Sequence, residues 1–224
     1  SADLGWGREV FSLSMAIQAL CWGITQPLAG IVADKRGAAQ VLAVGALLSA
    51  LGFFLRGAVA DPTVFILSGV IVGIGTGAAS FPVVIVALGK IVAPARRSFI
   101  LGLGTAAAST GMFVAAPASS TMIGQIGWQG GIYVIAASFL LILPLLTFIA
   151  GVSRPTATSG QGGGAWDAIR IAFTDSPYLL LFFGFFVCGF HVSFIQTHLP
   201  AFISDAGLSA AIAAWSLALI GLFN

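Results

Sequence analysis

Uninterrupted apolar runs, each long enough to cross a lipid bilayer, dominate this sequence. A helix needs about 20 apolar residues to cross roughly 30 Å of hydrocarbon. Because lipid offers the backbone no hydrogen-bond partners, such runs must form helices rather than open strands. The complete runs are Val10–Val32, Ala38–Ala60, Thr63–Leu88, Phe99–Gly124, Gly130–Val152 and Tyr178–Ile203, and a further run begins near Leu208. The sequence therefore predicts an all-α membrane protein of about seven transmembrane helices.

Charged side chains are too few to cover a water-exposed surface. Only 7% of the 224 residues are charged and 58% are hydrophobic, whereas about 25% of the residues of a soluble domain are charged. The lipid bilayer is therefore the expected partner of most of the surface. The net charge of +2 gives no indication of nucleic-acid binding, and none is predicted.

One connection between the apolar runs is long and polar. Ser153–Ser176 contains a glycine-rich stretch and separates a first group of spans, within residues 1–152, from a second group that begins in residues 177–224. Glycine-rich segments behave as flexible linkers. Within this one, Ala165–Phe173 is predicted to be a short amphipathic helix with Trp166 at the bilayer interface.

Basic residues gather in alternate loops. One side of the predicted bundle receives Lys35, Arg36, Lys90, Arg96, Arg97, Arg154 and Arg170, which are seven of the nine Lys and Arg residues. The other side has only Arg8 and Arg56. Short loops rich in Lys and Arg face the cytoplasm, so we expect a multi-pass protein whose first predicted helix ends on the cytoplasmic side.

The loop after the first span resembles a signature of the major facilitator superfamily. It reads Gly30-Ile-Val-Ala-Asp34-Lys-Arg36-Gly37, and in that family this loop joins the second and third of twelve helices. The resemblance implies conformational gating by Gly30, Asp34, Arg36 and Gly37, with the carboxylate acting as a charge latch that favours one arrangement of the two halves. The alternative is a solvated turn that carries only topology charges.

The register of the spans extends this resemblance over the whole chain. If the first run is helix two, residues 1–152 hold helices two to six, residues 153–176 form the central cytoplasmic loop, and residues 177–224 begin helices seven and eight. The chain then resembles a partial major-facilitator-type helical bundle, about seven of twelve helices, and both of its ends look like truncations.

Shorter stretches are similar to bacterial relatives of the monocarboxylate transporters. They are Gly5-Trp-Gly-Arg8, Gly127-Trp-Gln129, where the family often has Arg in place of Gln129, and Cys188-Gly-Phe-His191. This resemblance implies a secondary active transporter, not an enzyme, in the bacterial inner (plasma) membrane. It would carry a small organic anion together with a proton by alternating access. The alternatives are an efflux transporter for amphipathic compounds and a membrane receptor or sensor.

Histidines in the sixth apolar run are the first candidates for substrate binding. His191 lies about 20 Å from the Tyr178 end at about 1.5 Å per residue. His198 and Phe194 share its helix face. An imidazole among apolar side chains can hydrogen-bond a carboxylate or carry a proton near neutral pH. The alternative role for His191 is packing between helices, with a hydrogen bond to a backbone carbonyl.

Other polar groups within the spans are further candidates. Gln18 lies within the first run, where hydrogen bonding between helices is the alternative. Ser109 lies near the middle of the fourth run, where its hydroxyl can instead bond its own backbone. Arg56 is expected near the external end of the second run, either snorkelling to the interface or attracting anions there.

The remaining motifs predict packing rather than chemistry. Gly69, Gly73 and Gly77 recur once per helical turn, with Gly75 between them, and small residues at this spacing permit close helix approach. Gly-x-Gly triplets inside an apolar span do not form a nucleotide-binding loop. The sequence shows no Ser/His/Asp constellation and no Cys/His cluster with metal-ligand spacing, so no catalytic residue, cofactor or metal is predicted.

Overall fold

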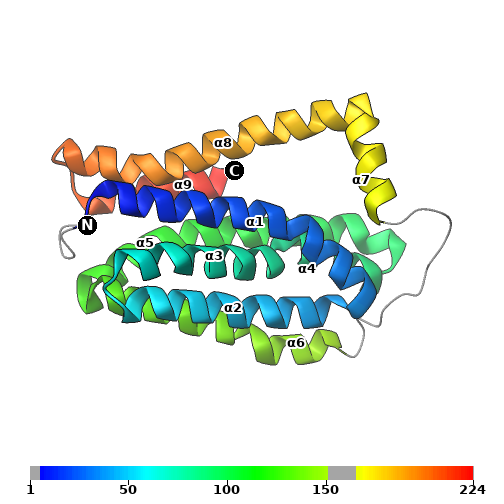
Figure 1. The fold of residues 1–224 in the computed structure, drawn as a ribbon, viewed down its shortest axis with the longest axis horizontal. Helices are drawn as coiled ribbons and strands as arrows, with labels where there is room; N and C mark the ends of the chain where they lie inside the picture. The colour runs from blue at the N-terminus through cyan, green and yellow to red at the C-terminus, as the bar shows by residue number, and fades with distance from the viewer. Residues whose placement is uncertain (1–5, 151–164, 224) are drawn as a thin grey trace. The chain divides into compact units, whose positions relative to one another are not determined.

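The computed structural model describes residues 6–150 and 165–223, and their regular structure is helical (Figure 1). The elements are α1 (Arg8–Arg36), α2 (Ala38–Ala58), α3 (Pro62–Ala78), α4 (Phe81–Ile91), the 3-10 helix η2 (Pro94–Arg96), α5 (Arg97–Leu140), α6 (Ile142–Ala150), α7 (Ala165–Thr174), α8 (Ser176–Asp205) and α9 (Ala210–Phe223). The glycine-rich stretch of the predicted linker lies outside the described residues.

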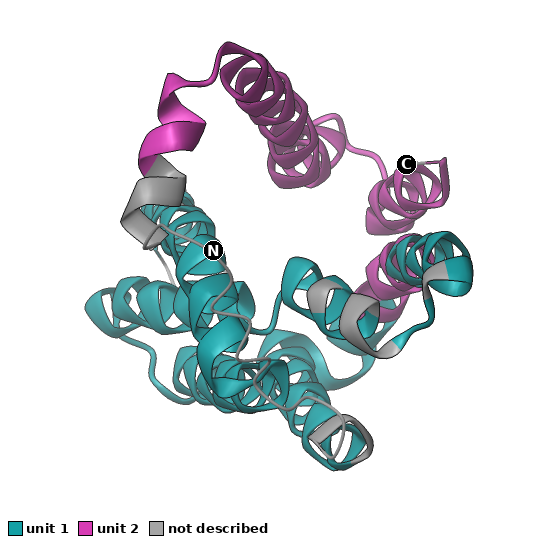
Figure 2. Ribbon diagram, turned by 90° about the vertical axis from the view of Figure 1, so that its right-hand side faces the viewer, with its two compact units in different colours: residues 1–108, 121–157 teal, residues 109–120, 158–224 magenta. Residues whose placement is uncertain are grey.

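The chain divides into two compact units, coloured separately in Figure 2. Unit 1 comprises Ser1–Ala108 and Thr121–Ala157, and unit 2 comprises Ser109–Ser120 and Thr158–Asn224. Unit 1 therefore holds α1 to α4, both ends of α5 and α6, whereas unit 2 holds a middle segment of α5 together with α7, α8 and α9.

Five helical stretches in the described residues are long and apolar enough to cross a membrane. They are Glu9–Arg36, Ala38–Ala58, Pro62–Ile85, Arg97–Thr147 and Ser176–Asp205, and the shorter α9 is also apolar. These stretches confirm the prediction of an all-α membrane protein. The stretch Arg97–Thr147 has 51 residues, which would be about 76 Å long as one straight helix at about 1.5 Å per residue. It therefore covers two of the predicted spans.

Gly127 divides α5 into these two spans. Its backbone is non-helical, with φ 73° and ψ 172°, a conformation that glycine adopts far more readily than other residues. After it the chain runs back along α2: Gln129 hydrogen-bonds the Gly57 carbonyl, and the Phe139 ring stacks 5.7 Å from that of Phe53. Because later residues meet earlier residues of α2, the part of α5 after Gly127 runs antiparallel to α2, and Figure 1 shows the chain turning back within α5.

The predicted span Thr63–Leu88 is formed by two helices, α3 and α4. Ser80 precedes α4 with extended backbone, and Pro82 stands in the first turn of that helix, where a missing N–H leaves no helical hydrogen bond unmade. Helix α4 continues beside α2 in the same direction as α3, because Val83 of α4 packs in the same buried cluster as Val41 of α2. The span is therefore bent rather than reversed.

Glycines bring α3 into close contact with its two neighbours in unit 1. A Cβ added at Gly73 would lie 2.5 Å from the Gln18 carbonyl oxygen of α1, and one added at Gly77 would lie 2.7 Å from Thr25 Cβ. On the other side, a Cβ at Gly52 of α2 would lie 2.7 Å from Val72 Cγ2. The predicted packing role of the glycine stripe is confirmed.

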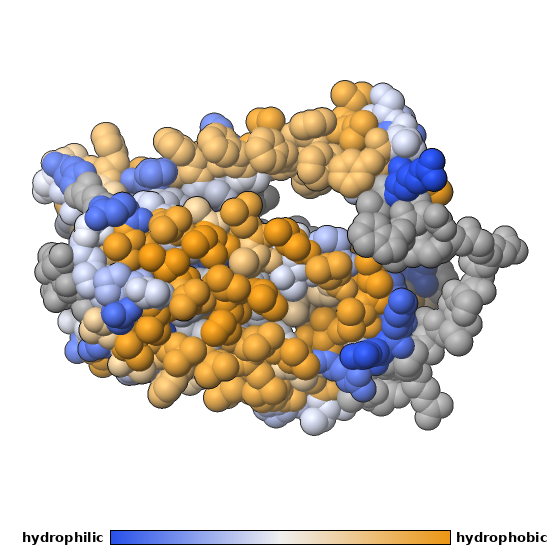
Figure 3. Space-filling view, in the orientation of Figure 1, coloured by the Kyte–Doolittle hydropathy of each residue, from blue (hydrophilic) through white to orange (hydrophobic). Residues whose placement is uncertain are grey.

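The surface of unit 1 is apolar along the helices and hydrophilic at their ends. Figure 3 shows orange side chains over α1 and α2 and blue ones at the two ends of these helices. Large apolar side chains such as Leu20, Ile24 and Val44 are more than half exposed. Such a surface requires lipid as its solvent, in agreement with the membrane prediction.

Unit 2 is assembled from helix α5 and the last three helices. The Phe113 ring of α5 lies 6.2 Å from that of Trp215 on α9, and a Cβ at Gly221 would lie 2.7 Å from Met112 Cβ. Helix α7 confirms the helix predicted at Ala165–Phe173. The unit thus also relies on close helix contact at a glycine.

We predict that Gly77→Ala destabilises unit 1, because its methyl group would overlap Thr25 and the Trp22 carbonyl oxygen. Overpacking of this kind costs about 1–3 kcal/mol and lowers the apparent melting temperature of the purified full-length protein in detergent. Gly23→Ala is the matched control, because nothing lies within 4 Å of its added Cβ. Equal melting temperatures for the two variants would show that α3 does not depend on this contact.

Candidate functional site

Two of the predicted substrate-binding residues meet in unit 1. Arg56, near the end of α2, hydrogen-bonds Gln18 of α1, with 3.1 Å between Nη1 and Oε1. The other four, Ser109, His191, Phe194 and His198, belong to unit 2. The structure thus places the predicted residues in two groups, of which the first forms a buried polar cluster.

Arg56 is buried, so its interpretation as a snorkelling side chain is wrong. Only 7% of the residue is exposed. Helices α1 and α3 cover the face of α2 from which it extends, because Ser14 and Ser68, one on each helix, both bond its guanidinium. A snorkelling arginine would instead keep its charged head in water.

Two serines hold one edge of the guanidinium. Nε donates to Ser68 Oγ at 3.2 Å, and Nη2 donates to Ser14 Oγ at 3.1 Å. Both hydroxyls in turn donate to the Phe65 carbonyl oxygen, at 2.6 Å from Ser68 and 3.2 Å from Ser14. Because each hydroxyl has one proton and gives it to Phe65, the lone pairs of both remain directed to Arg56.

Aromatic rings close the cluster on another side. The Cζ atom of Arg56 lies 4.8 Å from the centroid of the Phe65 ring and 5.9 Å from that of Phe53. Edge-on contacts at 5.5 Å and 5.0 Å join the Phe65 ring to those of Trp6 and Phe11. Rings at such distances attract a cation through their π-faces and exclude water from it.

The charge of Arg56 has no acidic partner among the described residues. Its three hydrogen-bond acceptors, Ser14, Gln18 and Ser68, are all neutral. Asp61, the acidic residue nearest in sequence, caps α3 instead, accepting from the Thr63 and Val64 amides at 2.8 and 3.0 Å. A charged side chain inside a membrane protein is a functional candidate by default, and this cation would attract an anion.

The predicted residues of α8 lie on one helix face and are exposed. The rings of Phe194 and His198 are 4.7 Å apart between centroids, and His191 is one turn before Phe194. In the segment of α5 that belongs to unit 2, Ser109 is half-buried. Nothing in these contacts tests whether the four residues bind substrate, so their role stays a prediction.

The predicted gating residues lie at the turn between α1 and α2. Asp34 and Arg36 are exposed, and Gly30 is half-buried. Gly37 separates the helices with φ 97° and ψ 141°, and its N–H donates to the Ala33 carbonyl at 2.9 Å. This positive φ favours glycine, which explains the second glycine of the motif; the latch itself remains a prediction.

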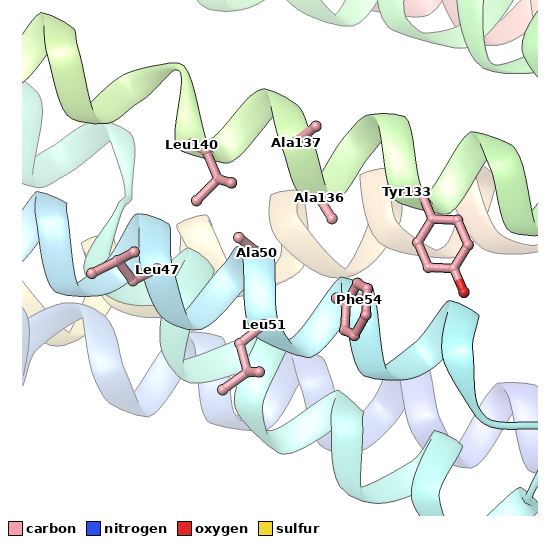
Figure 4. Close-up of a pocket in the computed structure, with 8 residues that line it drawn as sticks. All are labelled: Leu47, Ala50, Leu51, Phe54, Tyr133, Ala136, Ala137 and Leu140. Atoms are coloured by element: carbon pink, nitrogen blue, oxygen red, sulfur yellow. The ribbon is translucent and has the colours of Figure 1, made fainter.

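An apolar groove of about 440 Å³ runs between α2 and the part of α5 after Gly127 (Figure 4). It is lined by Leu47, Ala50, Leu51, Phe54, Tyr133, Ala136, Ala137 and Leu140. Among these side chains only Tyr133 carries a polar group, so the groove offers a small anion little to bind. It fits a lipid-facing surface better than a substrate site.

Three residues of the cluster, Ser14, Ser68 and Phe65, were not predicted from the sequence. One signal was available, because Ser14 lies four residues before Gln18 and therefore shares its helix face. Ser68 had no such signal, since its contact with Arg56 depends on how α3 is rotated against α2. From the sequence, Gln129 stood out only because the family that this chain resembles often has Arg at this position. In the structure its amide caps α2 by donating to the Gly57 carbonyl at 3.2 Å.

These features define a polytopic α-helical membrane protein with a buried cation between three of its helices. The sequence profile of the Major Facilitator Superfamily matches residues 1–224, and the chain belongs to this family. Members of the family are transporters and not enzymes.

Several proteins of known sequence are similar to this chain. The uncharacterized MFS-type transporter YcxA of Bacillus subtilis is 26% identical over 90% of this chain and 50% of its own length. The putative niacin/nicotinamide transporter NiaP of the same organism is 23% identical over 75% of this chain and 40% of its own. Mouse monocarboxylate transporter 14 is 30% identical over 57% of this chain and 24% of its own. The chain thus spans half or less of these relatives.

We predict that Ser68→Ala destabilises the protein through Arg56. The substitution leaves the buried Nε–H without an acceptor, which costs about 1–3 kcal/mol, and the melting temperature of the full-length protein should fall. In an Arg56→Met background the same substitution should have a much smaller effect, because no donor is stranded. A double-mutant cycle in detergent measures the difference, and additive effects would contradict the cluster.

Proposed function

We propose that the chain is part of a secondary active transporter that moves a small, monocarboxylate-like organic anion together with a proton by alternating access. The observation that carries this proposal is the buried guanidinium of Arg56, whose partners in the described residues are all neutral. Burying a charge without a counter-ion is expensive, and a carboxylate from the substrate would supply one.

The names of the relatives support the same substrate class. Mouse monocarboxylate transporter 14 is named for substrates with one carboxylate. The Bacillus subtilis relative is named for niacin, an aromatic carboxylic acid, and for nicotinamide, its neutral amide. One guanidinium matches one carboxylate, because its planar N–H groups suit the two carboxylate oxygens.

Proton coupling and gating are assigned to other parts of the chain. We propose that His191 carries the proton, with His198 and Phe194 beside it on α8, because a neutral imidazole nitrogen can accept a proton and later release it. The motif Gly30, Asp34, Arg36 and Gly37 would act as the latch between conformations. The distribution of basic residues favours a cytoplasmic position for the motif, and the two Bacillus subtilis relatives favour the bacterial inner membrane.

We predict that Arg56→Met abolishes carboxylate uptake while the protein still folds. Methionine fills much of the same volume without a charge, and replacing a buried ion by an apolar side chain is often neutral for stability. Uptake of labelled lactate and nicotinate into vesicles containing the full-length protein should fall about 100-fold or more, and Arg56→Lys should retain a part of it. Wild-type vesicles that accumulate no carboxylate, but extrude amphipathic compounds, would favour the efflux alternative.

We predict that His191→Ala uncouples uptake from pH. Wild-type uptake should rise when the outside is made acidic, and the variant should lose this dependence because the side chain that accepts the proton is gone. Cys188→Ala, one turn earlier on the same exposed stretch of α8, is the matched control and should behave like the wild type. Uptake that is indifferent to pH in the wild type would overturn the coupling proposal.

A further inference from the structure

The three acceptors around Arg56 are not equivalent. Ser14 and Ser68 are buried, and both are tied to the Phe65 carbonyl oxygen. Gln18 is half-buried, and its amide makes one hydrogen bond within the described cluster, to Nη1 of Arg56. The two serines therefore fix the guanidinium, whereas the amide is the partner that can leave.

The guanidinium also has unused donors. Arginine carries five N–H groups, of which the hydrogen bonds to Ser68, Gln18 and Ser14 occupy three: one on Nε, one on Nη1 and one on Nη2. Because Ser68 and Ser14 share the edge of the guanidinium that includes the Nε–H, the second N–H of Nη2 faces the end of the side chain, beside Nη1, where Gln18 Oε1 is bound. A carboxylate that replaced the Gln18 oxygen could therefore bind both terminal nitrogens at once.

The backbone near Gln18 is fixed by α3. A Cβ at Gly73 would lie 2.5 Å from the Gln18 carbonyl oxygen, and one at Gly69 would lie 2.8 Å from the Ser14 carbonyl oxygen. With two such contacts one turn apart, α1 cannot be displaced here without disrupting its packing on α3. An exchange at Arg56 would therefore involve a rotamer change of the Gln18 side chain and leave the α1 backbone in place.

We infer that Gln18 is a neutral placeholder for the substrate carboxylate at Arg56. In the empty state its Oε1 atom occupies Nη1; on binding, a carboxylate displaces it and takes both terminal nitrogens, while Ser14 and Ser68 hold the guanidinium in place. Charge-assisted hydrogen bonds are roughly twice as strong as neutral ones, so the exchange favours the anion. This inference rests on the proposed function and identifies its anion-binding residues.

Gln18→Glu tests the exchange, because it attaches a permanent carboxylate where the substrate carboxylate would bind. Benzoate is the probe, added as its sodium salt to the purified full-length protein in detergent and compared with sodium chloride at equal ionic strength. Benzoate should raise the melting temperature of the wild type. In Gln18→Glu the melting temperature without ligand should already be higher, and the apparent Kd for benzoate should increase about 100-fold or more.

Two variants serve as controls. Gln18→Ala removes the placeholder without adding a charge and should bind benzoate at least as tightly as the wild type. Gln26→Glu adds the same carboxylate to another half-buried glutamine of α1, about 12 Å further along the helix at about 1.5 Å per residue, and should leave benzoate binding unchanged. A loss of binding in Gln26→Glu equal to that in Gln18→Glu would reduce the effect to general charge repulsion and overturn the inference.

The inference and the proposed function fail in different ways. If benzoate stabilises the wild type and Gln18→Glu alike, the placeholder is wrong, and carboxylate uptake into vesicles still decides the function. If benzoate does not stabilise the wild type, Arg56 does not bind a carboxylate and the inference is overturned. If benzoate binds as described but vesicles accumulate no carboxylate, the site stands and the transport proposal fails.

Discussion

The close approach of α3 to α1 and α2 is the contact on which the rest of unit 1 depends. Apolar side chains gain nothing by leaving lipid for one another, so helices in a membrane are held by tight packing and by hydrogen bonds between them. The glycines of α3 and Gly52 of α2 remove the side chains that would keep the backbones apart. Only when the helices lie this close can side chains as short as those of Ser14 and Ser68 bring their hydroxyls to one guanidinium.

A buried cation is stable at this position because the neutral groups around it all stabilise positive charge. Serine hydroxyls, a carboxamide and two aromatic faces each stabilise positive charge without neutralising it. A permanent acidic partner would stabilise the arginine more strongly, but it would also compete with any anion that arrives. If Arg56 binds an anion as proposed, the neutral set leaves its electrostatic attraction available to that ligand.

The helices could be predicted from the sequence, whereas their mutual rotation could not. Apolar runs fixed each span to within a few residues, since lipid demands both the length and the internal hydrogen bonding. The snorkelling alternative for Arg56 was wrong because the place of the residue near the end of α2 gives its depth, not the direction of its side chain or the helices that cover it. Gln18 was found by its polarity alone, and Ser68 required the packing of α3. The reversal at Gly127 falls between two predicted spans, so the lengths of the apolar runs indicated it, whereas the bend at Ser80 falls inside one predicted span and was not predicted.

The proposed exchange at Arg56 also suits a transporter better than a receptor with a permanent ligand. A carrier must release what it binds, so its site has to remain stable in both the loaded and the empty state. Without a ligand, a bare guanidinium in this setting would be left with stranded donors, at about 1–3 kcal/mol for each unsatisfied group. The Gln18 amide reduces that penalty by occupying Nη1 when no anion is present. Its neutral oxygen is at the same time a weaker acceptor than a carboxylate, so it can be displaced, and the difference between the two acceptors sets how tightly the anion is held.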